Sequence, residues 1–192
     1  MISEKHNFIF LHVPKTGGTS IERALASHYD IYRFDYHFWH EESKHWSVHF
    51  TLQEMIKYKQ IKKPVNEYFV FSVVRNPWDR IVSAARWRQM DLEEFYFRTK
   101  SRPLKKLDHD RHKLAQTNFM KINQNIHVDF IGRFENLNND WLKICDKLNI
   151  EIEWPHMNKS EHNAYQDYYS PKMRDIIYKN YKEEIKLFKY EF

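Results

Sequence analysis

The stretch of sequence that decides the fold is FIFLHVPKTGGTS, residues 8–20. Its apolar first part, up to Val13, is typical of a buried strand in a parallel sheet, and we expect a helix over residues 20–26. The turn between them contains Gly17 and Gly18, two of only three glycines in the 192-residue chain. Glycine lets backbone amides approach a ligand closely, so this turn is interpreted as a binding loop.

The residues of this loop favour an anionic ligand. Amides at the start of a helix bind anions, and the helix dipole adds to the attraction. Lys15 contributes a positive charge, and hydroxyl groups come from Thr16, Thr19 and Ser20. We therefore predict that the loop binds a phosphate or sulfate group. The alternative is a structural turn that is merely polar, but such a one-sided choice of residues argues against it.

The loop differs from the common nucleotide-triphosphate loop, in which a glycine and four further residues precede Gly-Lys-Ser/Thr. Here Lys15 comes before the glycines, and Gly-Lys-Ser/Thr is absent from the sequence. The hydroxyl that holds Mg²⁺ in those proteins is therefore not placed in the usual way.

A second motif, RNPWDRIVS, covers residues 75–83. The apolar run before it, residues 68–74, is typical of a central parallel strand. Asn76 and Pro77 suit the N-cap and the first position of a helix, which we expect to reach about residue 90.

Arg75 and Ser83 of this motif are candidates for a second anion site. Arg75 stands at the carboxyl end of the expected strand, where parallel sheets bind their ligands. Ser83 lies about two helical turns after Asn76 and on the same face, so Arg75 and Ser83 can converge on one group. Two such sites indicate one ligand with two separated anionic groups. The alternative is an ion pair between Arg75 and Asp79, with Ser83 only packing.

Together the two motifs resemble the sulfotransferases that use 3′-phosphoadenosine 5′-phosphosulfate (PAPS), most closely the carbohydrate-type, family 2-like group. Residues 14–20 resemble the 5′-phosphosulfate loop of that family, and Arg75 and Ser83 resemble its pair of 3′-phosphate ligands. Residues 128–137 resemble a later core strand and its turn.

The resemblance implies a fold and a set of substrates. We expect an α/β protein with a mainly parallel central sheet flanked by helices, in the P-loop-like sulfotransferase fold, as a single domain over residues 1–192. PAPS is the expected donor cosubstrate, no metal is required, and the expected partner is a hydroxyl acceptor, a glycan or glycolipid. The expected donor-binding residues are Lys15, Thr16, Gly17, Gly18, Thr19, Ser20, Arg75 and Ser83.

The implied reaction needs a base for the acceptor hydroxyl and a cation for the leaving phosphate. Lys15 is the expected cation. His49 is the expected base, because it lies just before a capping box of Thr51 and Glu54, whose positive helix end disfavours an imidazolium. The family often has a histidine before a similar short helix, between its two donor motifs. His45 is the alternative base.

The composition is that of an ordinary globular domain, with 42% hydrophobic and 17% aromatic residues. No run of about 18 apolar residues is present and the mean hydropathy is −0.81, which argues against a transmembrane helix. Because the first core strand should begin by Phe8, we expect neither a signal peptide nor the membrane anchor that Golgi relatives carry. Cys145 is the only cysteine, which excludes an intrachain disulfide, and we expect a cytoplasmic protein.

The chain has a net charge of +5, and seven of its basic residues lie in one segment, residues 98–113. This segment is interpreted either as a rim that attracts an anionic substrate or as a solvated face. No nucleic-acid-binding motif accompanies it, so nucleic acid is not an expected partner. The seven basic residues are Arg98, Lys100, Arg102, Lys105, Lys106, Arg111 and Lys113.

Histidine clusters give only weak support to a metal site. His37, His40 and Glu41 lack a dependable third ligand at a suitable spacing, and the pair His109 and His112 is weaker still.

A further loop, residues 156–160, resembles a family segment near the nucleotide, where Lys159 or Ser160 would touch the 3′-phosphate. A plain surface loop is the alternative.

Two other functions stay open from the sequence. The first is a P-loop kinase-like phosphotransferase, against which the missing Gly-Lys-Ser/Thr and the Arg75 and Ser83 pair argue. The second is a non-catalytic nucleotide-binding module, against which Lys15 and a plausible base argue.

Overall fold

The centre of the molecule is a four-stranded sheet of β1 (Ile2–Ser3), β2 (Phe8–Leu11), β5 (Phe69–Val74) and β8 (Phe130–Arg133), side by side in that order. The computed structural model describes residues 1–32, 37–43, 45–97, 111–154 and 163–192. β2, β5 and β8 are parallel, and β1 is antiparallel at one edge. The predicted mainly parallel sheet is therefore confirmed.

Helices flank this sheet, as predicted. The α-helices are α1 (Gly18–Tyr29), α2 (Leu52–Lys57), α3 (Pro77–Trp87), α4 (Leu92–Phe97), α6 (Leu137–Leu148), α7 (Pro171–Asn180) and α8 (Lys182–Leu187). Short 3₁₀ helices are η2 (Ser47–His49), η3 (Val65–Glu67), η4 (Gln116–Phe119), η5 (Phe134–Asn136) and η6 (Tyr165–Tyr168). Two hairpins lie outside the central sheet, β3 (Trp39–His40) with β4 (His45–Trp46) and β6 (Lys121–Ile122) with β7 (Asn125–Ile126). Among the helices of the described residues, none is long and apolar enough to cross a membrane.

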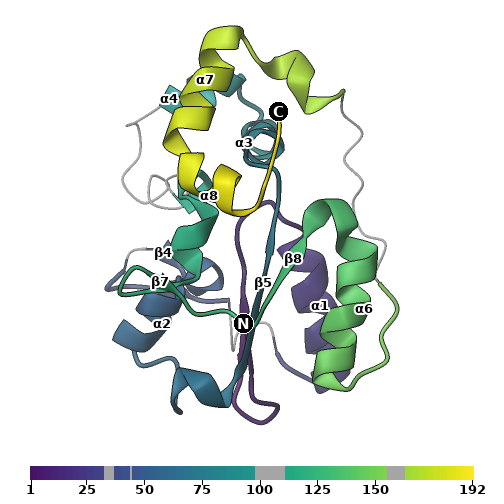
Figure 1. Ribbon diagram of the computed structural model, residues 1–192. Coiled ribbons are helices and arrows are strands. Elements are labelled where there is room, and N and C mark those ends of the chain that lie inside the picture. Colours follow the sequence, from purple (N-terminus) through teal and green to yellow (C-terminus); the bar gives the residue numbers. More distant parts are fainter. Residues whose placement is uncertain (33–36, 44, 98–110, 155–162) are drawn as a thin grey trace.

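Alternate residues of β2 build two separate cores, one on each face of the sheet. Phe8 and Phe10 pack with Trp141 in the core under α1 and α6, whereas Ile9 and Leu11 pack in the core on the side of α2. Figure 1 shows α1 and α6 together on one side of the strands and α2 on the other. The sheet is thus covered on both faces, as expected for parallel strands.

A third core lies beyond the carboxyl ends of the strands. In this core, α4, α7 and α8 gather around α3, the helix that follows β5 (Figure 1). Its buried residues include Trp78, Ile81, Phe95, Ile177 and Ile185.

Several helix boundaries differ from the expected ones. α1 begins at Gly18, two residues before the expected start, and α3 ends at Trp87. The C-terminal helical segment that begins at Pro171 is divided at Tyr181 into α7 and α8. Tyr181 is buried, and its hydroxyl donates to the carbonyl of Lys113 at 2.5 Å, so a tertiary contact has overridden a local helical pattern.

Candidate active site

The loop after β2 has a backbone that few side chains permit. Lys15 and Gly17 both have positive φ, 69° and 82°. The hydroxyl of Thr16 donates to the carbonyl of Val13 at 2.8 Å and ties the loop to the end of the strand. Such strained residues persist where the surrounding structure fixes them, and they concentrate at functional sites.

The start of α1 has no capping side chain from the described residues. Gly17 is the N-cap and has none to offer. Thr19 is exposed and Ser20 is buried, whereas Thr16 is buried with its hydroxyl proton already donated. The predicted loop is therefore suited to an anion, mainly through its backbone and Lys15.

Gly18 is required by its neighbour, and Gly17 is required by its positive φ and has close neighbours. A Cβ on Gly18 would lie 2.1 Å from the ring of His12, and one on Gly17 would lie 3.0 Å from Leu137. The loop is thus wedged between the side chain of His12 and the start of α6.

Three cationic side chains meet beside this loop. The Nζ of Lys15 lies 5.3 Å from the centre of the Trp87 ring. Burial, followed by the charges of Arg75 and Arg88, lowers the pKa of Lys15 to about 8. Among the described residues, Lys15 forms no ion pair with a carboxylate. A bound anion would relieve the repulsion within this cluster.

Arg75 links the second motif to the first. Its Nε and Nη2 donate to the two carboxylate oxygens of Asp79 at 2.7 and 2.9 Å, and its Nη1 donates to the carbonyl of Lys15 at 3.1 Å. The guanidinium also lies 4.1 Å from the centre of the Phe134 ring. The ion pair that the sequence left open is present, yet it uses only part of the five N–H donors of an arginine.

Ser83 lies on the face of α3 that Arg75 reaches. It follows Asp79 by one helical turn and precedes Trp87 by one turn, and it is half-buried. Asn76 caps the helix as predicted, since its side chain accepts from the amide of Trp78 at 3.1 Å.

His49 lies at the end of η2, directly against the loop. Its Nδ1 is 3.1 Å from the carbonyl of His12. A carbonyl only accepts, so this hydrogen bond requires the proton on Nδ1 and leaves Nε2 with a lone pair. Burial lowers the pKa of His49 well below its ordinary value, and the neighbouring His12 and His112 lower it further.

The environment of His49 differs partly from the expected one. The capping box of Thr51 and Glu54 is confirmed. The neutral state of His49, however, follows from burial and from adjacent histidine rings, whose centres lie 4.8 Å (His12) and 5.7 Å (His112) away.

Several residues at the site were not singled out from the sequence. His12 lies in an apolar run, and its Nδ1 is 3.0 Å from the carboxylate of Glu22 on α1. Trp87 stacks on His112 with the ring centres 5.0 Å apart. Gln116 binds the backbone of Arg75. No motif spacing joins these residues, because each contact forms between different segments of the fold.

Other predicted residues are only partly placed. His45 pairs with His40 across the β3–β4 hairpin, but its side chain is not described. His109, Lys159 and Ser160 lie outside the described residues, together with most of the basic segment. Within the described part of the chain, no group of three or more His, Cys, Asp or Glu side chains is arranged to hold a metal ion.

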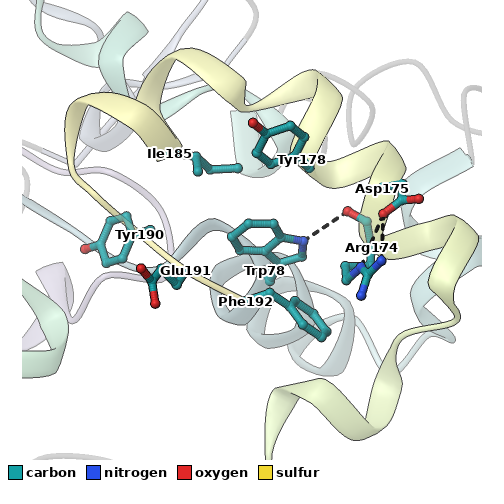
Figure 2. A pocket seen from close by; sticks show the side chains of 8 residues that line it. All are labelled: Trp78, Arg174, Asp175, Tyr178, Ile185, Tyr190, Glu191 and Phe192. Carbon is teal, nitrogen blue, oxygen red and sulfur yellow. Dashed lines mark hydrogen bonds and ion pairs between the residues drawn. The ribbon is translucent and has the colours of Figure 1, made fainter.

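A pocket of about 350 Å³ lies away from the loop, between α3, α7, α8 and the last residues of the chain (Figure 2). The indole of Trp78 lies at its centre and donates to the carbonyl of Arg174 at 3.1 Å, with Phe192 packed edge-on below it. The side chain of Asn76 donates to the carbonyl of Glu191 at 2.7 Å. The last residues of the chain thus support the start of α3, while the predicted site residues lie elsewhere.

A sequence model described as "Sulfotransferase family" matches residues 1–191. An uncharacterized protein of Archaeoglobus fulgidus is 29% identical over 99 residues, which cover 52% of this chain and 82% of that protein. No solved structure matches the chain.

Proposed function

The chain belongs to the sulfotransferase family, and on this basis we propose that it transfers a sulfuryl group from PAPS to a carbohydrate hydroxyl. The observation that carries the proposal is the contact between its two motifs, in which Nη1 of Arg75 donates to the carbonyl of Lys15 at 3.1 Å. Through this contact, Arg75 after β5 lies next to the backbone of Lys15 in the loop after the neighbouring strand β2. A donor with a 5′-phosphosulfate and a 3′-phosphate needs two such sites.

The 5′ end of the donor would bind the loop after β2. This loop, with its helix start at Gly18, supports a P-loop-like arrangement in which backbone amides and Lys15 hold the phosphosulfate. Thr19 and Ser20 supply further hydroxyl groups nearby. The 3′-phosphate would bind the remaining N–H groups of Arg75 and the hydroxyl of Ser83.

When PAPS is bound, the acceptor oxygen forms a bond to sulfur while the bond from sulfur to the bridging phosphate oxygen breaks, leaving adenosine 3′,5′-bisphosphate. His49 would take the acceptor proton on Nε2, which the hydrogen bond from Nδ1 to His12 leaves unprotonated. Lys15 would stabilise the negative charge that grows on the bridging oxygen. The half-buried loop would hold the donor so that the acceptor oxygen, the sulfur and the bridging oxygen lie in line.

The carbohydrate acceptor rests on the family resemblance. His37 and Trp46, whose rings lie 5.0 Å apart, belong to the segment that precedes His49 in the chain and would border the acceptor side.

Calorimetric titration of the full chain tests the donor. We expect adenosine 3′,5′-bisphosphate to bind without Mg²⁺ and much more tightly than AMP, because only the bisphosphate reaches Arg75. ATP with Mg²⁺ serves as the comparison for a phosphotransferase. Equal affinities for the bisphosphate and AMP, or tighter binding of ATP with Mg²⁺, would refute the donor assignment.

The acceptor needs a separate experiment. Incubation with sulfur-labelled PAPS and fractionated cell extract should transfer label to glycans or glycolipids, and treatment with glycosidases should release it. Label that stays on a protein or a small phenol after this treatment would contradict the carbohydrate assignment.

A further inference from the structure

The side chain of Gln116 binds the backbone of Arg75 from both sides of its amide group. Its Oε1 accepts from the amide of Arg75 at 2.9 Å, and its Nε2 donates to the carbonyl of Arg75 at 2.8 Å. Gln116 is fully buried in η4 and lies 41 residues along the chain from Arg75. Strand pairing of β5 ends at Val74, so this side chain takes the place of a neighbouring strand for the next residue.

A buried carboxylate fixes the orientation of that amide. The backbone amide of Gln116 donates to one oxygen of Glu184 at 2.5 Å, and Nε2 donates to the other at 3.0 Å. Since a carboxylate only accepts, Nε2 must face Glu184, and Oε1 is left to face the amide of Arg75. A reversed amide would set donors against donors and acceptors against acceptors.

The carboxylate of Glu184 is buried, which disfavours its ionised form. Burial raises the pKa of Glu184, and the nearby charge of Arg80 opposes the rise. Arg80 is also fully buried, and its guanidinium donates to the carbonyls of His112 at 3.0 Å and Leu114 at 2.8 Å, just before Gln116. Two buried ionisable side chains, Arg80 and Glu184, therefore hold the segment that carries Gln116.

We propose that Gln116 is a positioning residue that aims Arg75 at the 3′-phosphate, and that it thereby sets the preference of the protein for 3′-phosphorylated nucleotides. This inference rests on the proposed function. The guanidinium can form paired hydrogen bonds to a phosphate only within a narrow range of angles. The hydrogen bonds from Gln116 fix the backbone of Arg75 and so the position of its Cα. The carboxylate of Asp79 then fixes the orientation of the guanidinium group.

The test is the ratio of two affinities measured by calorimetry on the full chain, for adenosine 3′,5′-bisphosphate and for AMP. Gln116→Met keeps the length of the side chain but removes both hydrogen bonds to Arg75. We expect the preference for the bisphosphate to fall by roughly tenfold, as one misdirected charge-assisted hydrogen bond would cost. AMP affinity should change less, because AMP does not reach Arg75.

The neighbouring Thr117 gives a matched control. It is fully buried in the same 3₁₀ helix, and its hydroxyl has no hydrogen-bond partner among the described residues. Thr117→Val should preserve the ratio, because the Thr117 hydroxyl makes no hydrogen bond to Arg75. A purely structural role for Gln116 would lower both affinities, or the thermal stability, and leave the ratio unchanged.

The outcomes separate the two proposals. A wild type without preference for the bisphosphate overturns the donor assignment and this inference together. A wild type with the preference, beside a Gln116→Met variant that keeps it, overturns this inference alone, as does an equal loss in Thr117→Val. If Gln116→Met does not fold, Glu184→Gln replaces it. This change leaves one acceptor oxygen for the two donors of Gln116, its backbone amide and Nε2, so that the orientation of its side-chain amide is no longer fixed, and an unchanged ratio in that variant likewise refutes the inference.

Discussion

The loop after β2 and the turn after β5 lie side by side, yet they are held in opposite ways. The loop is shaped by its own backbone, with positive φ at Lys15 and Gly17 and a hydrogen bond from Thr16 to Val13. The turn has an ordinary backbone that is held from a distance: Gln116 binds Arg75, and Glu135 accepts from the amide of Asn76 at 2.6 Å. The conformation of the loop should therefore be lost when its own residues are substituted. The conformation of the turn should instead respond to substitutions at residues far along the chain.

The largest effect is expected at the base beside the loop. His49→Ala should lower turnover by roughly 10²–10⁴-fold, the usual contribution of a general base, and leave affinity for adenosine 3′,5′-bisphosphate unchanged. Steady-state kinetics with PAPS and calorimetry on the product nucleotide check the two parts. His45→Ala is the matched control and should stay active. An inactive His45→Ala beside an active His49→Ala would move the role to His45.

Removal of the loop cation should be nearly as costly. Lys15→Ala is expected to lower turnover by about 10²–10³-fold, because Lys15 meets the charge that grows on the leaving phosphate. Binding of the bisphosphate, measured by calorimetry, should fall less than turnover. Near-normal turnover in this variant would show that sulfuryl transfer takes place elsewhere.

Loss of Arg75 should weaken the bisphosphate by roughly 2–4 kcal/mol, since a phosphate is left without its charged partner. AMP should also bind somewhat less well, because Nη1 of Arg75 braces the carbonyl of Lys15. Calorimetry on Arg75→Ala with both nucleotides measures the difference. An equal loss for both nucleotides would mean that Arg75 only supports the loop after β2 and does not bind the 3′-phosphate. The turn after β5 would then have no separate binding role.

A methyl group added to the loop tests the packing of its backbone without removing a polar group. Gly18→Ala places its Cβ 2.1 Å from the ring of His12, so we expect a loss of about 1–3 kcal/mol in the free energy of unfolding. Gly132→Ala, whose Cβ would meet its nearest neighbours at 3.4 Å, should cost less. Chemical denaturation compares the two variants, and equal stability would show that His12 moves aside easily.

The smallest effect concerns pH. Lys15, with its pKa lowered to about 8, should lose its proton above that pH in the ligand-free protein. Bisphosphate affinity should then fall by up to about tenfold for each pH unit. Lys15→Arg should remove this alkaline decline in a calorimetric pH series. Below the ordinary histidine pKa, turnover should persist until His49 is protonated, because its pKa is depressed.

The parts of the site that could be read from the sequence are those that depend on neighbours along the chain. The strand before Pro14, the capping residue Asn76 and the capping box of Thr51 all follow local rules, and the structure confirms them. The position of Arg75 at the end of a parallel strand follows from the same rules.

The rest depends on contacts between distant segments. Gln116 and Glu135 reach the turn after β5 across 41 and 59 residues, and His12 reaches His49 across 37. Neither a propensity nor a spacing records such a contact, since it exists only after the sheet has formed. The break at Tyr181 has the same origin, because burial of its ring outweighs the local preference for one continuous helix.

Trp87 gives the site an optical consequence. Its indole is 54% exposed, with the guanidinium of Arg88 at 4.4 Å and the ammonium of Lys15 at 5.3 Å from the ring centre. The emission of an indole responds to the electric field around it, and an anion seated on Lys15 would change that field. Trp87 therefore acts as a built-in fluorescent reporter at the loop, one that a Trp87→Phe variant would silence while the other five tryptophans keep their signal.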